Sequence, residues 1–124
     1  MKSTDAIKSL SALAQESRLS VFRMLVKRGP EGYTPTQLGE KLNVPSPTLS
    51  FHLKELSHAR LVSCRQEGRF LYYSADFERM AAVMTFLTHN CCKGMPQECL
   101  TVMETALGDC LPSATKRRRA KSNA

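Results

Sequence analysis

The segment LNVPSPTLSFHLKELSHARLV, from Leu42 to Val62, carries the strongest structural signal in the chain. Ser46 and Pro47 pair a hydroxyl cap with a proline at the first helical position, where the missing N–H is not needed. Leucines then recur at spacings of four and three, the period of a helix with one buried face: Leu49, Leu53 and Leu56. We therefore expect a helix whose outer side presents Thr48, Ser50, Phe51, Lys54 and His58.

Three more helices are expected before this one. Apolar residues at spacings of three and four predict a first helix from Ser3 to Gln15 and a second from about Ser17 to Arg28, which Gly29-Pro30 ends. The run Thr34-Pro35-Thr36-Gln37 is typical of a capping box, in which the cap and the residue three positions later satisfy each other's backbone N–H groups. It predicts a short third helix that ends at Leu42.

A β-hairpin and two helices are expected after Arg60. The hydrophobic period changes to two over residues 61–66 and 70–74, which flank the charged tip Glu67-Gly68-Arg69. A fifth helix begins near Asp76 and ends near His89, and its apolar stripe is Met80, Val83, Met84 and Leu87. A last helix covers residues 97–107. This order predicts a mainly α winged helix-turn-helix fold with five to six helices and one hairpin wing.

The predicted fold suggests a DNA-binding surface. Hydroxyl groups and free amides at the start of the fourth helix can bind phosphates and base edges, and nearby basic groups can neutralise the DNA backbone. Operators of this class are usually two-fold, so a module this small needs a homodimer to place two such helices. The simpler alternative is a packed helical corner with solvated hairpin arginines. The candidate DNA contacts are Ser46, Thr48, Ser50, Lys54, Arg65 and Arg69.

Three cysteines fall within nine residues, at Cys91, Cys92 and Cys99. Thiolates form a soft site that selects thiophilic ions, and one acid, Glu98, is too few for a hard-ion cage. A structural zinc site normally closes with four ligands, for which His89 is available, whereas trivalent arsenic or antimony accepts three sulfurs in a pyramid. The other two cysteines, Cys64 and Cys110, are expected to be small buried apolar residues.

The residues of the fourth helix resemble the recognition helix of the ArsR/SmtB family of metal-responsive repressors. Residues 12–26 and the wing residues 68–74 are similar to two further family signatures, and Phe51 stands where members commonly carry a polar residue. The resemblance implies dimerisation through the first and fifth helices. It also adds His52 to the candidate DNA contacts, although its spacing from the leucines equally fits a packing role. The matching recognition-helix positions are Ser50, His52, Leu53, Leu56, Ala59, Leu61 and Val62.

The cysteine arrangement resembles a subgroup of arsenic-responsive repressors that carry a Cys-Cys pair and a third Cys near the C-terminus. The resemblance implies As(III), and with it Sb(III), as the inducer that Cys91, Cys92 and Cys99 bind to release operator DNA. Three rivals stay open: a thiol redox switch, a zinc-stabilised interaction module and a small cysteine enzyme such as an arsenate reductase. The enzyme lacks support, because the chain has neither a Cys-x-x-Cys motif nor a phosphate-cradling loop.

Composition sets the wider expectations. The 124 residues, 42% of them hydrophobic, suit one small module. The net charge is +7, but five of the 18 basic residues follow Thr115, where there is no acid, so the other 13 face 11 acids. We expect a metalloid-sensing winged helix-turn-helix domain over residues 1–110 and a basic, disordered tail over 111–124. No bilayer-spanning run or export signal is evident, so a cytoplasmic protein is expected.

Overall fold

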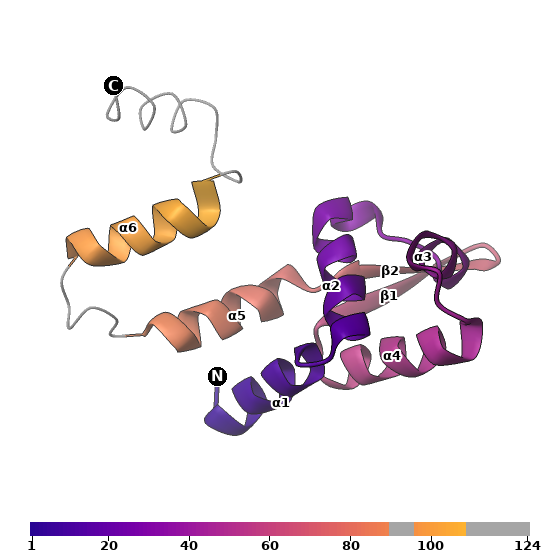
Figure 1. Ribbon diagram of the computed structural model, residues 1–124, viewed down its shortest axis with the longest axis horizontal. Coiled ribbons are helices and arrows are strands. Elements are labelled where there is room, and N and C mark those ends of the chain that lie inside the picture. Colours follow the sequence, from indigo (N-terminus) through magenta and orange to yellow (C-terminus); the bar gives the residue numbers. More distant parts are fainter. Residues whose placement is uncertain (90–95, 109–124) are drawn as a thin grey trace. The chain divides into compact units, whose positions relative to one another are not determined.

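The computed structural model describes residues 1–89 and 96–108. They form the expected winged helix-turn-helix fold, with a two-stranded antiparallel wing (Figure 1). The chain divides into two units, one spanning Met1–Leu87 and another that begins at Thr88. In chain order the elements are α1 (Ser3–Leu13), α2 (Glu16–Arg28), the 3-10 turn η1 (Gly29–Glu31), α3 (Pro35–Leu42), α4 (Ser46–His58), β1 (Val62–Glu67), β2 (Phe70–Ala75), α5 (Phe77–Thr88) and α6 (Pro96–Leu107).

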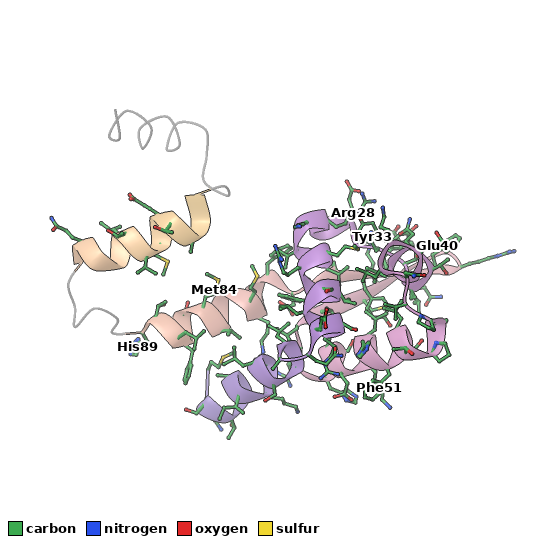
Figure 2. The ribbon with its side chains drawn as sticks, viewed as in Figure 1. Arg28, Tyr33, Glu40, Phe51, Met84 and His89 are labelled. Atoms are coloured by element: carbon green, nitrogen blue, oxygen red, sulfur yellow. The ribbon has the colours of Figure 1, made fainter. Side chains whose placement is uncertain are left out.

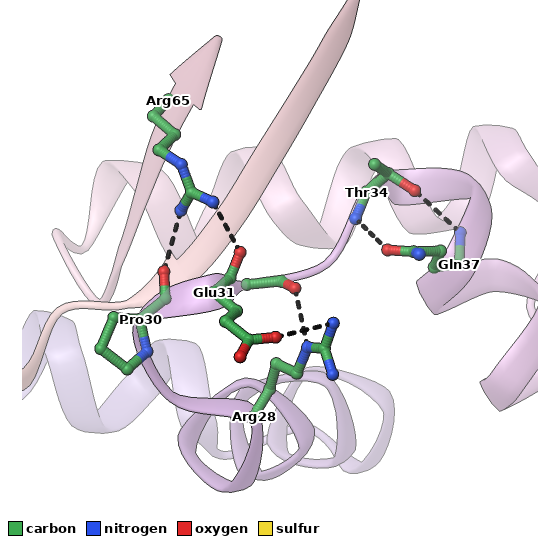
Figure 3. Close-up of polar contacts among 7 residues, drawn as sticks. Arg28, Pro30, Glu31, Thr34, Gln37 and Arg65 are labelled. Atoms are coloured by element: carbon green, nitrogen blue, oxygen red, sulfur yellow. Dashed lines mark hydrogen bonds and ion pairs between the residues drawn. The ribbon is translucent and has the colours of Figure 1, made fainter. Parts of the chain in front are cut away.

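The helix-turn-helix pair α3–α4 follows from its turn residues. Thr34 Oγ1 accepts a hydrogen bond from Gln37 N at 3.2 Å, and Gln37 Oε1 accepts one from Thr34 N at 2.9 Å, so the predicted capping box is confirmed (Figure 3). Asn43 ends α3 in the left-handed conformation, with φ of 55°. Asparagine tolerates this region better than most residues, and the chain can therefore turn at once toward α4.

The predicted hydroxyl cap of α4 is wrong by one position. Ser46 is the first helical residue and Pro47 the second, while Pro45 takes the cap position without a side-chain hydrogen bond. The Pro45 carbonyl already accepts the first helical bond, from Leu49 N at 2.9 Å. A proline ring fixes φ near the value the cap needs, here −58°, so Pro45 can begin the helix without a hydroxyl group.

The core of the first unit forms around α2, which packs against α1, α3, α4 and β2 (Figure 1). The helical spacing of the apolar residues predicts this packing, because it places them on one face of α2, where they meet the leucine row of α4. The same core includes the strand residues Val62 and Ala75. Its most completely buried large side chains are Val21, Leu25, Leu38, Leu49, Leu56 and Leu61.

The wing is an antiparallel hairpin in which Val62 pairs with Ala75 and Glu67 with Phe70. Gly68 and Arg69 form its two-residue turn, and Gly68 has the positive φ, 61°, that such turns require. A single bridge joins Tyr73 of β2 to Tyr33, with hydrogen bonds of 2.9 and 2.8 Å. The base of the wing is therefore attached to the segment that leads into α3.

Helix α5 starts as expected, but its apolar stripe is only partly buried. Asp76 Oδ1 accepts a hydrogen bond from Arg79 N at 3.0 Å and caps the helix. Val83 is buried, whereas Leu87 is exposed, as is Ile7 of α1, so the expected inward faces of these helices are only partly covered within one chain. No helix within residues 1–89 and 96–108 combines the length and apolar character that a membrane crossing requires.

Candidate nucleic-acid interface

Helix α4 separates into a buried row and an exposed face, as its leucine spacing predicts. Leu49, Leu53 and Leu56 are buried in the core. Four of the sequence-predicted DNA contacts lie on the exposed side: Ser46, Thr48, Ser50 and Lys54. These hydroxyl and ammonium groups project from the first three turns of the helix, where they can meet phosphates and base edges.

His52 lies on the buried side of the same helix. Its side chain is only 7% exposed, and its Nδ1 atom has no hydrogen-bond partner among the residues that the structure describes. Burial, followed by the nearby charge of Arg18, lowers the pKa of His52 below its ordinary value of 6.5. This placement favours the packing role over a contact with bases, and a neutral imidazole is the form that the core accepts near neutral pH.

The guanidinium group of Arg65, on the wing, donates hydrogen bonds to other residues of the protein. Its Nη1 and Nη2 atoms each donate at 2.8 Å, to the carbonyl oxygens of Pro30 and Glu31 (Figure 3). Its Nε donates to Glu67 Oε1 at 2.9 Å, and the group also lies 5.0 Å from the centre of the Tyr72 ring. Arg65 therefore joins the hairpin to η1. Local sequence could not show this contact, because its partners lie 34 and 35 residues away.

Arg69, by contrast, stands exposed in the hairpin turn. It makes no hydrogen bond or ion pair with any other residue in 1–89 or 96–108. A flexible, fully charged side chain at the end of a projecting hairpin is suited to reach a phosphate or a groove beside the one that α4 occupies. Of the two wing arginines predicted to contact DNA, Arg69 is the one whose guanidinium has no bond to another described residue.

A basic cluster near the end of α2 was not predicted from the sequence. The Arg28 guanidinium lies 4.8 Å from the centre of the Tyr33 ring, and Lys41 Nζ lies 5.6 Å from it. Figure 2 labels Arg28 and Tyr33 close together. Arg28 also pairs with Glu31 at 3.1 Å and donates to the Gly32 carbonyl at 3.1 Å. This cluster holds the loop before α3 in place, and only the tertiary structure brings its members together.

Most of the proposed metalloid ligands cannot be placed in the fold. Cys91 and Cys92 lie outside the described residues, as does Cys110, and Cys99 is placed only by its backbone, within α6. Within the described part of the chain, no three potential metal-binding side chains come together. Cys64 was expected to be buried, and that expectation is wrong: it is exposed, because most of β1 projects beyond the core with solvent on both faces.

These features define a class of protein: a DNA-binding winged helix-turn-helix regulator. A family model described as a helix-turn-helix domain matches residues 13–65. The uncharacterised HTH-type transcriptional regulator YceK of Bacillus subtilis is 37% identical over 75 residues, which cover 59% of this chain and 74% of that protein. The chain belongs to the family of helix-turn-helix transcriptional regulators, which are not enzymes.

Solved structures of other regulators are similar to the chain. An ArsR-like transcriptional regulator from Rhodococcus sp. RHA1 has a TM-score of 0.65 and 19% identity, over 83% of this chain and 92% of that one. Its likeness supports the fold. Another is the structure of a possible transcriptional regulator for arsenical resistance, with a TM-score of 0.57 and 26% identity over 64% of this chain and 80% of that one.

Proposed function

We propose that this protein is a metalloid-responsive repressor that binds operator DNA as a homodimer. The observation that supports DNA binding is the exposed face of α4, where hydroxyl groups and Lys54 lie opposite the buried leucine row. In this proposal α4 enters the major groove, and Arg69 reaches the adjacent backbone from the wing. Arg65 acts indirectly, because its bonds to the Pro30 and Glu31 carbonyls fix the wing.

Apolar residues left exposed on α1 and α5 support the dimer. Ile7 and Leu10 on α1 and Phe86 and Leu87 on α5 are all exposed large side chains of the first unit. The two helices are joined through Ser9 Oγ, which accepts a hydrogen bond from Arg79 Nε at 3.3 Å. Burying these residues against a second copy would remove apolar surface from water and place two α4 helices on one two-fold operator.

The inducer we propose is As(III) or Sb(III), held by Cys91, Cys92 and Cys99. The donor set supports this assignment: three soft thiolates satisfy a pyramidal trivalent metalloid, whereas structural zinc normally requires four ligands. One similar structure is that of a possible transcriptional regulator for arsenical resistance. The cysteine pair also follows α5 within a few residues, close in sequence to the proposed dimer surface.

Release from DNA then follows from linkage. A metalloid that binds the DNA-free dimer better than the DNA-bound dimer shifts the population away from the operator. A coupling free energy of about 1–3 kcal/mol corresponds to a roughly 5–150-fold loss of operator affinity. That range suffices to relieve repression when the repressor is scarce.

Fluorescence anisotropy tests the proposal. A labelled promoter fragment is titrated with the protein and then with arsenite, antimonite, zinc and hydrogen peroxide in turn. We expect specific binding and release by arsenite and antimonite. Cys91→Ser, Cys92→Ser and Cys99→Ser should bind the operator normally but resist release. The matched control is Cys64→Ser, which removes an exposed thiol outside the trio and should respond like the wild type.

The other outcomes identify the rivals. Release by peroxide without any metalloid would replace the metalloid site with a redox switch. Release by zinc alone would indicate a four-ligand site. Release by arsenite that persists in all three serine variants would refute the cysteine assignment.

A further inference from the structure

Phe51 occupies the middle of the exposed face of α4. It follows Pro47 by four residues and precedes Lys54 by three, so at 3.6 residues per turn the three side chains lie in one row. That row is opposite the buried leucines. The Phe51 side chain is 54% exposed, and Figure 2 labels it on the side of α4 that faces away from α2 and the hairpin.

The folded first unit gives Phe51 little to pack against. Its ring contact is with the neighbouring His52, with centroids 5.7 Å apart and ring planes inclined by 60°. Phe51 is absent from the core cluster and from the partly buried residues packed on it. The Phe51 ring therefore contributes little to the packing of this unit and stays available for a contact outside it.

The neighbours of Phe51 indicate what covers it. Thr48, Ser50 and Lys54 surround it with hydroxyl groups and a positive charge, all exposed. An apolar protein surface would desolvate these groups without pairing them. The major groove of B-DNA matches the whole set, because it offers phosphates and base-edge acceptors for the polar groups and one apolar feature, the C5-methyl group of thymine, for the ring.

We infer that Phe51 is a specificity-determining residue that packs its ring against a thymine methyl group in each half of the operator. This inference rests on the proposed DNA-binding function and deepens it. The polar residues of α4 set the position of the helix in the groove, while Phe51 distinguishes thymine from cytosine at one step. The discrimination is by contact with a methyl group, so it needs no hydrogen bond from the side chain.

Replacing thymine by deoxyuridine tests the inference, because deoxyuridine keeps every hydrogen-bonding group and lacks only the methyl. High-affinity sites are first selected with the full-length protein from a random duplex pool, and each thymine is then replaced in turn. For the wild type we expect one thymine per half-site whose replacement weakens binding about fourfold, the equivalent of about 0.8 kcal/mol per buried methyl-sized group. Replacing both should weaken binding roughly 15-fold.

Two variants assign the effect to the side chain. Phe51→Ala should weaken binding to the thymine site and make the deoxyuridine site equally good, so the methyl effect disappears. The matched control is Leu19→Ala, which removes a 43% exposed apolar side chain from α2 and should keep the full methyl effect. Circular dichroism of both variants should match the wild type, because neither side chain belongs to the core.

The outcomes separate the inference from the proposed function. A wild type that selects no duplex sequence would overturn both. Specific binding that no deoxyuridine replacement weakens would overturn the role of Phe51 and leave the repressor intact. A methyl effect that survives in Phe51→Ala would assign the methyl contact to another residue and also overturn the inference.

Discussion

Burial of His52 makes the stability of the fold depend on pH. Burial and then Arg18 lower its pKa in the folded protein below 6.5, so the unfolded chain binds the proton more readily. The free energy of unfolding therefore has its full value above about pH 6.5, where His52 is neutral in both states. It falls as the pH decreases from the pKa of His52 in the unfolded chain toward the lower pKa in the folded protein. Urea unfolding of the wild type between about pH 8 and about pH 5, on either side of the ordinary histidine pKa, should show this loss.

Replacement variants assign the pH effect to one imidazole. His52→Leu removes the titrating group and should flatten the stability profile over this range. His58→Gln alters an exposed histidine at the end of the same helix and should retain the wild-type slope. A wild-type slope in His52→Leu would show that another group is responsible.

The two wing arginines should respond differently to alanine substitution. Arg65→Ala removes the bonds to the Pro30 and Glu31 carbonyls, so the hairpin amides should exchange hydrogen faster. Because Arg65 is exposed, the free energy of unfolding should fall by only about 1 kcal/mol or less. Exchange as slow as in the wild type would contradict the anchoring role.

Arg69→Ala is the matched change at the turn of the same hairpin. It removes a cation without internal partners among the described residues, so hairpin exchange should stay unchanged. DNA affinity should fall, and the slope of log affinity against log salt should decrease by about 1 for each phosphate that is no longer neutralised. An unchanged salt slope would show that Arg69 does not bind the DNA backbone.

The α3 helix depends on its capping box. Thr34→Ala removes the acceptor of the Gln37 N–H bond and should lower the free energy of unfolding by about 1 kcal/mol, measured by urea denaturation. Thr36→Ala, on the exposed side of the same turn, is the control and should change stability by no more than about 0.5 kcal/mol. Equal losses in both variants would contradict the capping assignment.

Elements set by local chemistry could be predicted from the sequence, and contacts between distant segments could not. The capping box at Thr34 and the buried row of α4 depend on residues within one or two turns, and both predictions are confirmed. The predicted cap at Ser46 is wrong because Pro45 takes the cap position, and the helix begins there without a side-chain cap. The bonds of Arg65 to η1 and the exposure of Cys64 depend on how the hairpin projects from the core, which period and spacing do not specify.

The proposed dimer explains why two helices keep apolar residues exposed. Ile7→Glu and Leu87→Glu place charges on α1 and α5 at positions that a single chain leaves open to solvent. Each should therefore fold normally but sediment as a monomer, and operator affinity should fall because the two α4 helices are no longer linked. Leu19→Glu on α2 is the control and should remain a dimer. A dimer that persists in both variants would place the interface elsewhere.

In the proposed mechanism, three cysteines bind the metalloid that releases the repressor from the operator. X-ray absorption at the arsenic edge, on the protein loaded with an equivalent of arsenite, measures the atoms bound to arsenic directly. We predict that wild type and Cys64→Ser show three sulfur neighbours and no oxygen, and that Cys91→Ser, Cys92→Ser and Cys99→Ser each lose one sulfur. Arsenic that is bound through oxygen in the wild type, or that keeps three sulfurs in Cys91→Ser, Cys92→Ser and Cys99→Ser alike, would contradict this assignment.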